Sequence, residues 1–248
     1  MGAAWFRFYA ELNDFLPAES RGRPVERRFD APASVKDCIE SFGVPHTEVE
    51  LVLVNGAPVD FTYRVRDADA ISVYPVFESL DVTPVPRVRA APLRNLRFVL
   101  DVHLGRLAAY LRMAGFDAEY RNDAADPELA ETVARGQRVL LTRDRYLLMR
   151  SNVDRGYFVR SNEPKRQLVE VLKRFELANS LRPFTRCMRC NGELTEVSRE
   201  DVLECVPPGV RERREFRRCA TCGQVYWEGT HHARMRTMLE WAKDEALR

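Results

Sequence analysis

The sequence contains no long hydrophobic run. Nothing in its 248 residues approaches the roughly 18 consecutive apolar residues of a membrane-spanning helix. Residues 1–10 also lack the basic stretch followed by an apolar stretch that marks a secretory signal. We therefore expect a cytoplasmic protein without a membrane partner. Because 45% of the residues are hydrophobic and 31% are charged, wholesale disorder is also excluded.

Lysine is scarce, and the net charge is small. The chain has 39 lysines and arginines against 37 acids, and only four of the 39 are lysines. Residues 1–80 carry 8 basic and 13 acidic side chains, a net charge of −5, whereas residues 81–248 carry 31 and 24, a net charge of +7. The planar guanidinium of arginine suits phosphate binding, so the basic part favours a polyanion partner. Genome composition explains an arginine bias equally well.

The first segment, residues 1–80, predicts a small mixed α/β domain. The expected strands are residues 5–9, 25–29, 49–54 and 70–76. Ser34 is a suitable N-cap for one helix between the second and third strands, and the order β-β-α-β-β fits a sheet with one helix on one face. Residues 50–56 (ELVLVNG) and 69–75 (DAISVYP) resemble the ubiquitin-like β-grasp domains of the ThiS/MoaD sulfur-carrier type.

Sulfur carriers of that type act through a C-terminal Gly-Gly. Here the last strand runs into residues 76–80 (VFESL) and the chain continues, so we expect a docking or regulatory module with an unidentified protein partner. Residues 81–94 contain three prolines and few apolar residues, which is typical of a stiff linker.

The second segment, residues 95–181, alternates strand-like and helix-like stretches. The expected strands are residues 96–100, 118–120, 139–142 and 157–159, and the expected helices are residues 104–113, a helix opening at Asp126-Pro127, and residues 168–175. Repeated β-α units of this length predict a parallel sheet with helices on both faces.

Two acids follow strands of this predicted sheet. Asp101 directly follows the first strand, and Asp144 follows the third. In the strand order 2-1-3-4 these strands are neighbours, so the two carboxylates would converge beyond their carboxyl ends. Converging carboxylates repel unless a cation bridges them, and oxygen ligands suit Mg²⁺ or Mn²⁺. The alternative is that each aspartate is a helix N-cap.

Other polar residues near this edge are weaker candidates. Asp123 and Asp126 could complete the acidic cluster, although Asp126 is also a suitable N-cap before Pro127. The candidates for substrate binding are Arg106, Arg112, Arg143 and Asn162. Each arginine could equally be an ordinary surface residue, and Asn162 could cap a helix.

The third segment, residues 182–248, predicts a zinc ribbon and a C-terminal helix. Its two C-x-x-C pairs are Cys187, Cys190, Cys219 and Cys222. Four thiolates at two such turns suit one tetrahedral structural Zn²⁺. The alternatives are a redox pair or two disulfides, and a reducing compartment argues against disulfides. His231 or His232 could replace a ligand, whereas Cys38 fits the core of the first domain.

Three motifs together carry a more specific resemblance. They are residues 98–108 (FVLDVHLGRLA), residues 139–144 (VLLTRD), and residues 183–192 (PFTRCMRCNG) continued by 216–219 (FRRC) and 225–227 (VYW). They resemble the Mut-seven C-terminal RNase domain family. The resemblance implies a PIN-like nuclease fold with a zinc ribbon, a ubiquitin-like domain in front, and metal-dependent endoribonuclease chemistry. By position it gives Asp101 and Asp144 the metal-binding role and makes Asp123 or Asp126 the middle acid.

The sequence thus predicts a ribonuclease that cleaves RNA phosphodiester bonds at a carboxylate-bound Mg²⁺ or Mn²⁺. Its substrate would be RNA, for example tRNA or ribosome-associated RNA, although neither acids nor arginines distinguish RNA from DNA. One alternative is a non-catalytic RNA- or ribosome-binding factor with a degenerate site. Another is a nuclease restrained by its own N-terminal domain.

Overall fold

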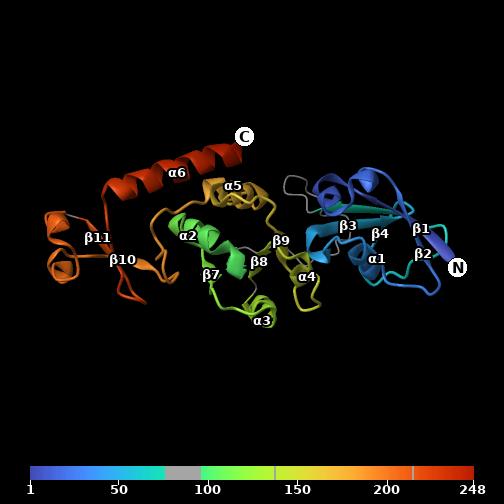
Figure 1. The fold of residues 1–248 in the computed structure, drawn as a ribbon, viewed down its shortest axis with the longest axis horizontal. Helices are drawn as coiled ribbons and strands as arrows, with labels where there is room; N and C mark the ends of the chain where they lie inside the picture. The colour runs from blue at the N-terminus through green and yellow to red at the C-terminus, as the bar shows by residue number, and fades with distance from the viewer. Residues whose placement is uncertain (76–95, 137, 214) are drawn as a thin grey trace. The chain divides into compact units, whose positions relative to one another are not determined.

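The computed structural model describes residues 1–75, 96–136, 138–213 and 215–248 (Figure 1). The described residues form two compact units. One comprises the described parts of Met1–Arg94 and Asp126–Phe158, and the other those of Asn95–Ala125 and Val159–Arg248. The linker predicted over residues 81–94 lies outside the described residues.

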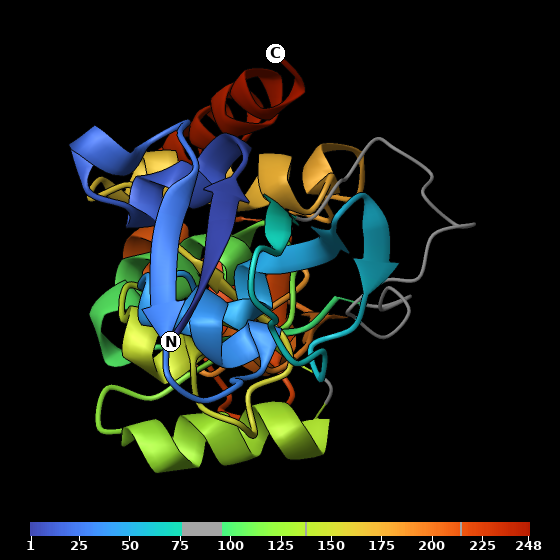
Figure 2. The same cartoon turned by 90° about the vertical axis from the view of Figure 1, so that its right-hand side faces the viewer.

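The N-terminal domain is a five-stranded mixed sheet with one helix (Figure 2). Its strands are β1 (Gly2–Phe8), β2 (Val25–Phe29), β3 (Val49–Val54), β4 (Ala57–Val59) and β5 (Ala70–Pro75), in the order β2-β1-β5-β3-β4. β1 and β5 are parallel, and the other described pairs are antiparallel. Short 3-10 helices lie at Ala10–Phe15, Ala18–Ser20 and His46–Glu48. The predicted β-grasp fold is confirmed.

Helix α1 (Val35–Ser41) begins where the sequence predicts. The hydroxyl of Ser34 accepts a hydrogen bond from the backbone N–H of Asp37 at 3.0 Å, as an N-cap does. The helix buries Cys38 and Ile39 against the inward side chains of the sheet. Strand β4 was not predicted; it follows a turn at Asn55-Gly56 and pairs with β3.

The central sheet has the strand order β7-β6-β8-β9. The strands are β6 (Phe98–Leu100), β7 (Ala118–Tyr120), β8 (Val139–Thr142) and β9 (Gly156–Phe158), and the helices between and after them are α2 (Gly105–Met113), α3 (Asp126–Gly136), α4 (Arg145–Leu148) and α5 (Pro164–Arg174). β6 pairs in parallel with β7, and β8 pairs in parallel with β9. In chain order this is 2-1-3-4, so the predicted parallel α/β sheet is confirmed.

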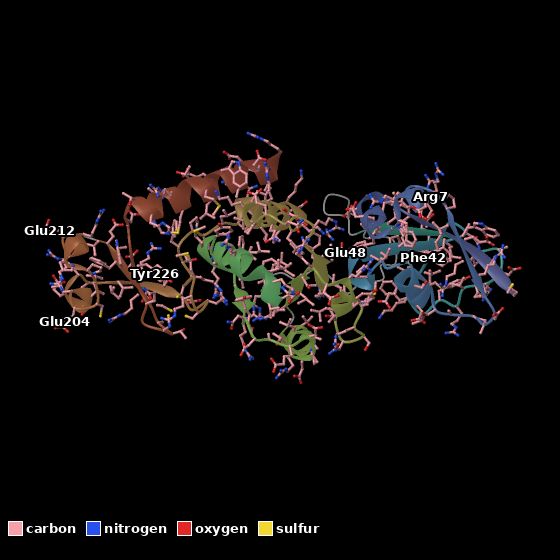
Figure 3. The ribbon with its side chains drawn as sticks, viewed as in Figure 1. Arg7, Phe42, Glu48, Glu204, Glu212 and Tyr226 are labelled. Carbon is pink, nitrogen blue, oxygen red and sulfur yellow. The ribbon has the colours of Figure 1, made fainter. Side chains whose placement is uncertain are left out.

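Residues 126–158 group with the N-terminal domain because of buried contacts near β9. Glu48, labelled in Figure 3, accepts a hydrogen bond at Oε1 from Phe158 N at 2.6 Å. His46 Nε2 lies 2.9 Å from the carbonyl oxygen of Val153. The ring of Phe15 meets that of Phe158 edge-on, with 5.4 Å between centroids. The domain boundaries derived from the sequence stay a prediction.

The C-terminal part is a small antiparallel sheet followed by a long helix. The sheet consists of β10 (Leu194–Val197), β11 (Phe216–Cys219) and β12 (Val225–Trp227), in that order, and α6 (Thr230–Leu247) ends the chain. Short 3-10 helices lie at Val102–Leu104 and Leu177–Asn179 in the central part, and at Glu200–Val202 and Pro208–Val210 in the C-terminal part. α6 lies along α5 (Figure 1). Arg166 of α5 pairs with Glu245 of α6 at 2.9 Å and lies over the ring of Trp241. In the described part of the chain, no helix combines the length and apolar character needed to cross a membrane.

Candidate metal centre and acidic site

Two equivalent backbone turns carry the four cysteines. In the first turn the N–H of Asn191 donates to the carbonyl of Cys187 at 2.9 Å, and in the second the N–H of Gly223 donates to the carbonyl of Cys219 at 3.0 Å. Asn191 and Gly223 have φ angles of 70° and 72°. Glycine and asparagine adopt this left-handed conformation more readily than other residues. The turn therefore explains the residue type that follows each C-x-x-C pair.

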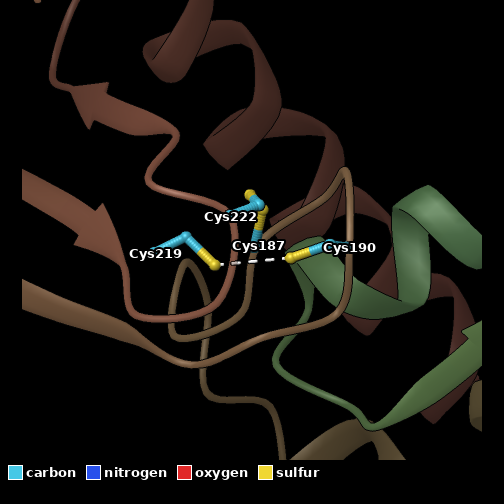
Figure 4. A group of neighbouring side chains, drawn as sticks. All are labelled: Cys187, Cys190, Cys219 and Cys222. Carbon is cyan, nitrogen blue, oxygen red and sulfur yellow. Dashed lines mark hydrogen bonds between the residues drawn. The ribbon is translucent and has the colours of Figure 1, made fainter.

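The four sulfur atoms lie at the corners of one small cluster (Figure 4). Cys187 Sγ is 3.6 Å from Cys222 Sγ, Cys190 Sγ is 3.4 Å from Cys219 Sγ, and all four lie within 4.8 Å of one another. Sulfurs about 2.3 Å from a tetrahedral zinc ion are about 3.8 Å apart, whereas a disulfide bond is about 2.05 Å long. The four cysteines could therefore hold a structural metal ion such as zinc, and their spacing does not fit disulfides.

The thiols of the cluster differ in their readiness to ionise. Burial raises the pKa of Cys190 to about 12. Burial acts in the same direction on Cys219, but hydrogen bonds from the backbone N–H groups of Cys222 and Thr221 outweigh it and lower the pKa of Cys219 to about 7. Because a coordinated cation favours the thiolate, metal binding would offset the effect of burial on Cys190.

Tyr226 makes a contact with the cluster that sequence reasoning missed. Tyr226 is labelled in Figure 3, and its hydroxyl oxygen lies 3.2 Å from Cys187 Sγ. Burial raises the pKa of Tyr226 above its ordinary value, so the hydroxyl keeps its proton and can donate a hydrogen bond to the sulfur when Cys187 is a thiolate. The sequence did contain a signal for this residue, because Tyr226 lies in the last motif of the family resemblance, residues 225–227.

Arg112 holds the first cysteine turn. It is only 4% exposed. Its Nε donates to the carbonyl of Ala118 at 2.8 Å, and its Nη1 donates to the carbonyls of Met188 and Arg189 at 3.1 and 3.0 Å. Because the guanidinium is buried among backbone carbonyls, we assign Arg112 to the packing of this turn. The phosphate contact that the sequence suggested for Arg112 stays a prediction.

Asn191 ties the same turn to β7. Its Oδ1 accepts a hydrogen bond from the N–H of Ala118 at 3.0 Å, and its Nδ2 donates to Asp117 Oδ1 at 2.7 Å. Arg112 and Asn191 therefore both fasten the cysteine cluster to the strand and helix that follow β6.

Asp101 and Asp144 both lie at strand ends, in different surroundings. Asp101 directly follows β6, is 4% exposed, and its side chain does not cap the turn that follows. Asp144 caps α4, since its Oδ1 accepts from the N–H groups of Tyr146 at 2.7 Å and Leu147 at 3.4 Å. The two acids belong to different compact units, so their predicted convergence stays a prediction.

The two candidates for a middle acid are both accessible. The side chain of Asp123 is 70% exposed and pairs with Arg121 Nε at 3.1 Å, and this hydrogen bond lowers the pKa of Asp123. Asp126 is the first residue of α3, and its Oδ2 lies 4.0 Å from Arg150 Nη2. The structure therefore gives each of them an arginine partner.

The remaining candidates for substrate binding lie on loops and on a helix surface. Arg106 is exposed on α2, and Arg143 is half-buried between β8 and Asp144. Asn162 is exposed, and Glu163 rather than Asn162 occupies the N-cap position of α5. Their roles stay predictions.

The family comparisons cover both halves of the chain. The Mut7-C ubiquitin domain matches residues 1–81, and the Mut7-C RNAse domain matches residues 96–239. The second match includes both strand-end acids and all four clustered cysteines. No curated protein and no solved structure matches the chain. Because the RNAse domain covers more than half of the 248 residues, the chain belongs to the Mut7-C RNAse domain family, with a Mut7-C ubiquitin domain in front.

Proposed function

We propose that the protein is a metal-dependent ribonuclease in which Asp101 and Asp144 hold a catalytic Mg²⁺ or Mn²⁺. The observation that carries the proposal is the match of the RNAse domain family to residues 96–239. The positions of the acids support it, because each follows the carboxyl end of a strand in a parallel sheet, where such sheets bind their ligands.

The carboxylates suit a hard cation. Asp101 directly follows β6 and is 4% exposed, and carboxylate oxygens are the ligands that Mg²⁺ and Mn²⁺ prefer. At Asp144 both capping hydrogen bonds end on Oδ1, which leaves Oδ2 as the better placed oxygen for a ligand. When bound, Mg²⁺ or Mn²⁺ would favour deprotonation of water and neutralise phosphate charge. Asp123 or Asp126 would be the further acid.

The substrate would be RNA, for example tRNA or ribosome-associated RNA, in the cytoplasm. Arg106 and Arg143 would contact phosphates and Asn162 a polar group of the RNA. We propose that the cysteine cluster holds Zn²⁺ in a structural role, because a site closed by four sulfurs has no open position for a substrate. A protein partner would bind the ubiquitin-like domain.

A second candidate function is a non-catalytic RNA-binding factor. The capping of α4 by Asp144 favours it, since this gives the acid a structural purpose without catalysis. A test must therefore remove the charge of Asp144 and keep the cap.

We therefore measure cleavage of a labelled single-stranded RNA in Mn²⁺ by the Asp101→Asn and Asp144→Asn variants. Each substitution removes the charge of the acid. Asparagine keeps the capping oxygen and is an equally good N-cap. We expect cleavage to fall about 100-fold or more in both variants, because several kcal/mol of charge stabilisation is lost. Asp154→Asn, at an exposed acid before β9, is the matched control and should cleave like the wild type.

Equal cleavage by the wild type and both variants would show that the catalytic assignment is wrong. If none of the proteins cleaves and all bind RNA with a steep salt dependence, the binding-factor function is correct instead.

A further inference from the structure

A shallow groove lies beside the candidate catalytic acid Asp144. Its volume is about 510 Å³. The ubiquitin-like domain lines it with Phe15, Pro17 and the Phe42-Gly43 pair, and α4 lines it with Arg145 and Tyr146. All of these residues belong to one compact unit. We call it the Tyr146 groove.

Tyr146 presents an accessible aromatic ring two residues after the candidate catalytic acid Asp144. The residue is 71% exposed. Its backbone N–H donates to Asp144 Oδ1 at 2.7 Å, so the start of its side chain is anchored by the same carboxylate that would hold the catalytic cation. Flat exposed rings next to a phosphate-processing site are the surfaces on which unpaired bases stack.

Arg145 adds a positive charge that the ubiquitin-like domain helps to place. Its guanidinium carbon lies 5.7 Å from the centre of the Tyr146 ring. A Cβ at Gly43 would lie 3.0 Å from Arg145 Nη1, and Gly43 has a φ of +83°. The backbone conformation therefore favours glycine at position 43, and the missing side chain leaves room for this guanidinium.

The acidic residue of the groove is engaged with a histidine. Glu40 Oε1 lies 2.6 Å from His46 Nδ1, so this oxygen is already engaged in a hydrogen bond. Proteins bind single-stranded nucleic acids with aromatic rings that stack on bases and arginines that contact phosphates. Tyr146 and Arg145 therefore favour RNA over an apolar peptide as the ligand of this groove.

We infer that the Tyr146 groove binds one unpaired nucleotide of a single-stranded RNA, with its base stacked on Tyr146 and a phosphate on Arg145. The ubiquitin-like domain would then form one wall of the substrate site, in addition to any docking role. This inference rests on the proposed ribonuclease function, because it takes Asp144 as the neighbouring catalytic acid.

Binding of fluorescently labelled octa-adenylate to the full chain tests the stacking. The background is Asp101→Asn, and binding is measured without added Mg²⁺ or Mn²⁺, which suppresses metal-dependent cleavage whether or not Asp101 is catalytic. We expect Tyr146→Ala to weaken binding about 5-fold or more and Tyr146→Phe to bind like its parent, because the ring does the stacking. Trp5→Ala removes another exposed aromatic, 43% exposed on β1 and outside the groove, and should leave binding unchanged.

An abasic ribose-phosphate octamer separates stacking from other effects. It should bind Tyr146→Ala and its parent equally, since it has no base to stack. Equal binding of octa-adenylate by Tyr146→Ala and its parent, or an equal loss with the abasic chain, would overturn the inference. For Arg145→Gln, the slope of log affinity against log salt should fall by about 0.7, and an unchanged slope would exclude the phosphate contact.

The outcome is distinguishable from a failure of the proposed function. If Asp101→Asn and Asp144→Asn cleave like the wild type while Tyr146→Ala loses base-dependent binding, the groove stands and the catalytic assignment fails. If the acid variants lose cleavage and Tyr146→Ala binds octa-adenylate like its parent, the catalytic assignment stands and the inference about the groove fails.

Discussion

The carboxylate of Glu48 accepts a hydrogen bond from the backbone N–H of Phe158, with 2.6 Å between Oε1 and N, across 110 positions of the sequence. Glu48 lies next to β3 of the ubiquitin-like domain, and Phe158 ends β9 of the central sheet. Glu48 is 1% exposed. A buried carboxylate that satisfies a strand N–H makes the ubiquitin-like domain part of the packing of β9, and a merely tethered domain would lack this contact.

We therefore predict that Glu48→Ala lowers the free energy of unfolding by about 2–3 kcal/mol, since it leaves the N–H of Phe158 buried without this acceptor. Glu48→Gln keeps an acceptor oxygen and should lose less. Urea unfolding monitored by circular dichroism measures both. Glu19→Ala, at an exposed acid of the same domain, should change stability by no more than about 0.5 kcal/mol. Wild-type stability in Glu48→Ala would contradict the packing role.

Arg112 leads to a second prediction, for the other compact unit. Arg112→Met keeps the apolar stem of the side chain and removes three hydrogen bonds to the carbonyls of Ala118, Met188 and Arg189. We expect a loss of about 2–4 kcal/mol in unfolding free energy, because buried carbonyls lose charged donors. Arg106→Met, on the exposed face of the same helix, is the control for thermal unfolding. A phosphate-binding role instead would leave the stability of Arg112→Met unchanged and reduce its affinity for RNA.

Much of the fold could be predicted because its strands are short apolar runs between clear turn signals. The predicted ranges 25–29, 49–54, 118–120 and 139–142 coincide with β2, β3, β7 and β8. The elements that were missed include β4, of three residues, α4, of four, and the strands β11 and β12 of the C-terminal sheet, of four and three. Such short elements contain too few residues to show a period, and tertiary pairing decides them.

The candidate site was predictable where spacing alone determines the chemistry. The two C-x-x-C pairs indicated four ligands, and their sulfur atoms do come together. Arg112 could not be assigned from sequence, because its long apolar stem packs with the buried face of α2 while its charged end reaches carbonyls 76 and 77 positions away. Tyr146 could not be assigned from sequence either, because the exposure of its ring depends on which residues pack around the one-turn helix α4.

The metal site provides a third prediction. We expect one zinc ion per chain by elemental analysis, in the wild type and in Cys205→Ser, because Cys205 is exposed and outside the cluster. Cys219→Ser should lose most of the zinc, and β10–β12 should lose their cooperative unfolding, since structural zinc contributes folding free energy directly. Acid should release the metal as protons compete for the thiolates. A full zinc content in Cys219→Ser would exclude the four-cysteine site.

A fourth prediction concerns the effect of Tyr226 on the metal affinity of this site. Tyr226→Phe removes the hydroxyl that lies 3.2 Å from Cys187 Sγ and keeps the ring. Loss of a hydrogen bond to a metal ligand reduces metal affinity by about 10-fold or more, which competition with a chromophoric chelator measures. Tyr120→Phe is a matched control, because its hydroxyl donates to the carbonyl of Val102 and does not contact the cysteines. Equal affinity in Tyr226→Phe and the wild type would show that the contact has no effect on the metal.

Asp144 combines a structural and a proposed catalytic role, and two substitutions separate them. Asp144→Asn keeps an oxygen for the N–H groups of Tyr146 and Leu147, so its unfolding free energy should match the wild type within about 0.5 kcal/mol. Asp144→Ala removes the cap and should lose about 1 kcal/mol. If Asp144 is catalytic, both variants lose RNA cleavage alike, although only one loses stability. Cleavage that instead follows stability, retained in Asp144→Asn and reduced in Asp144→Ala, would mean that the acid acts only by capping α4.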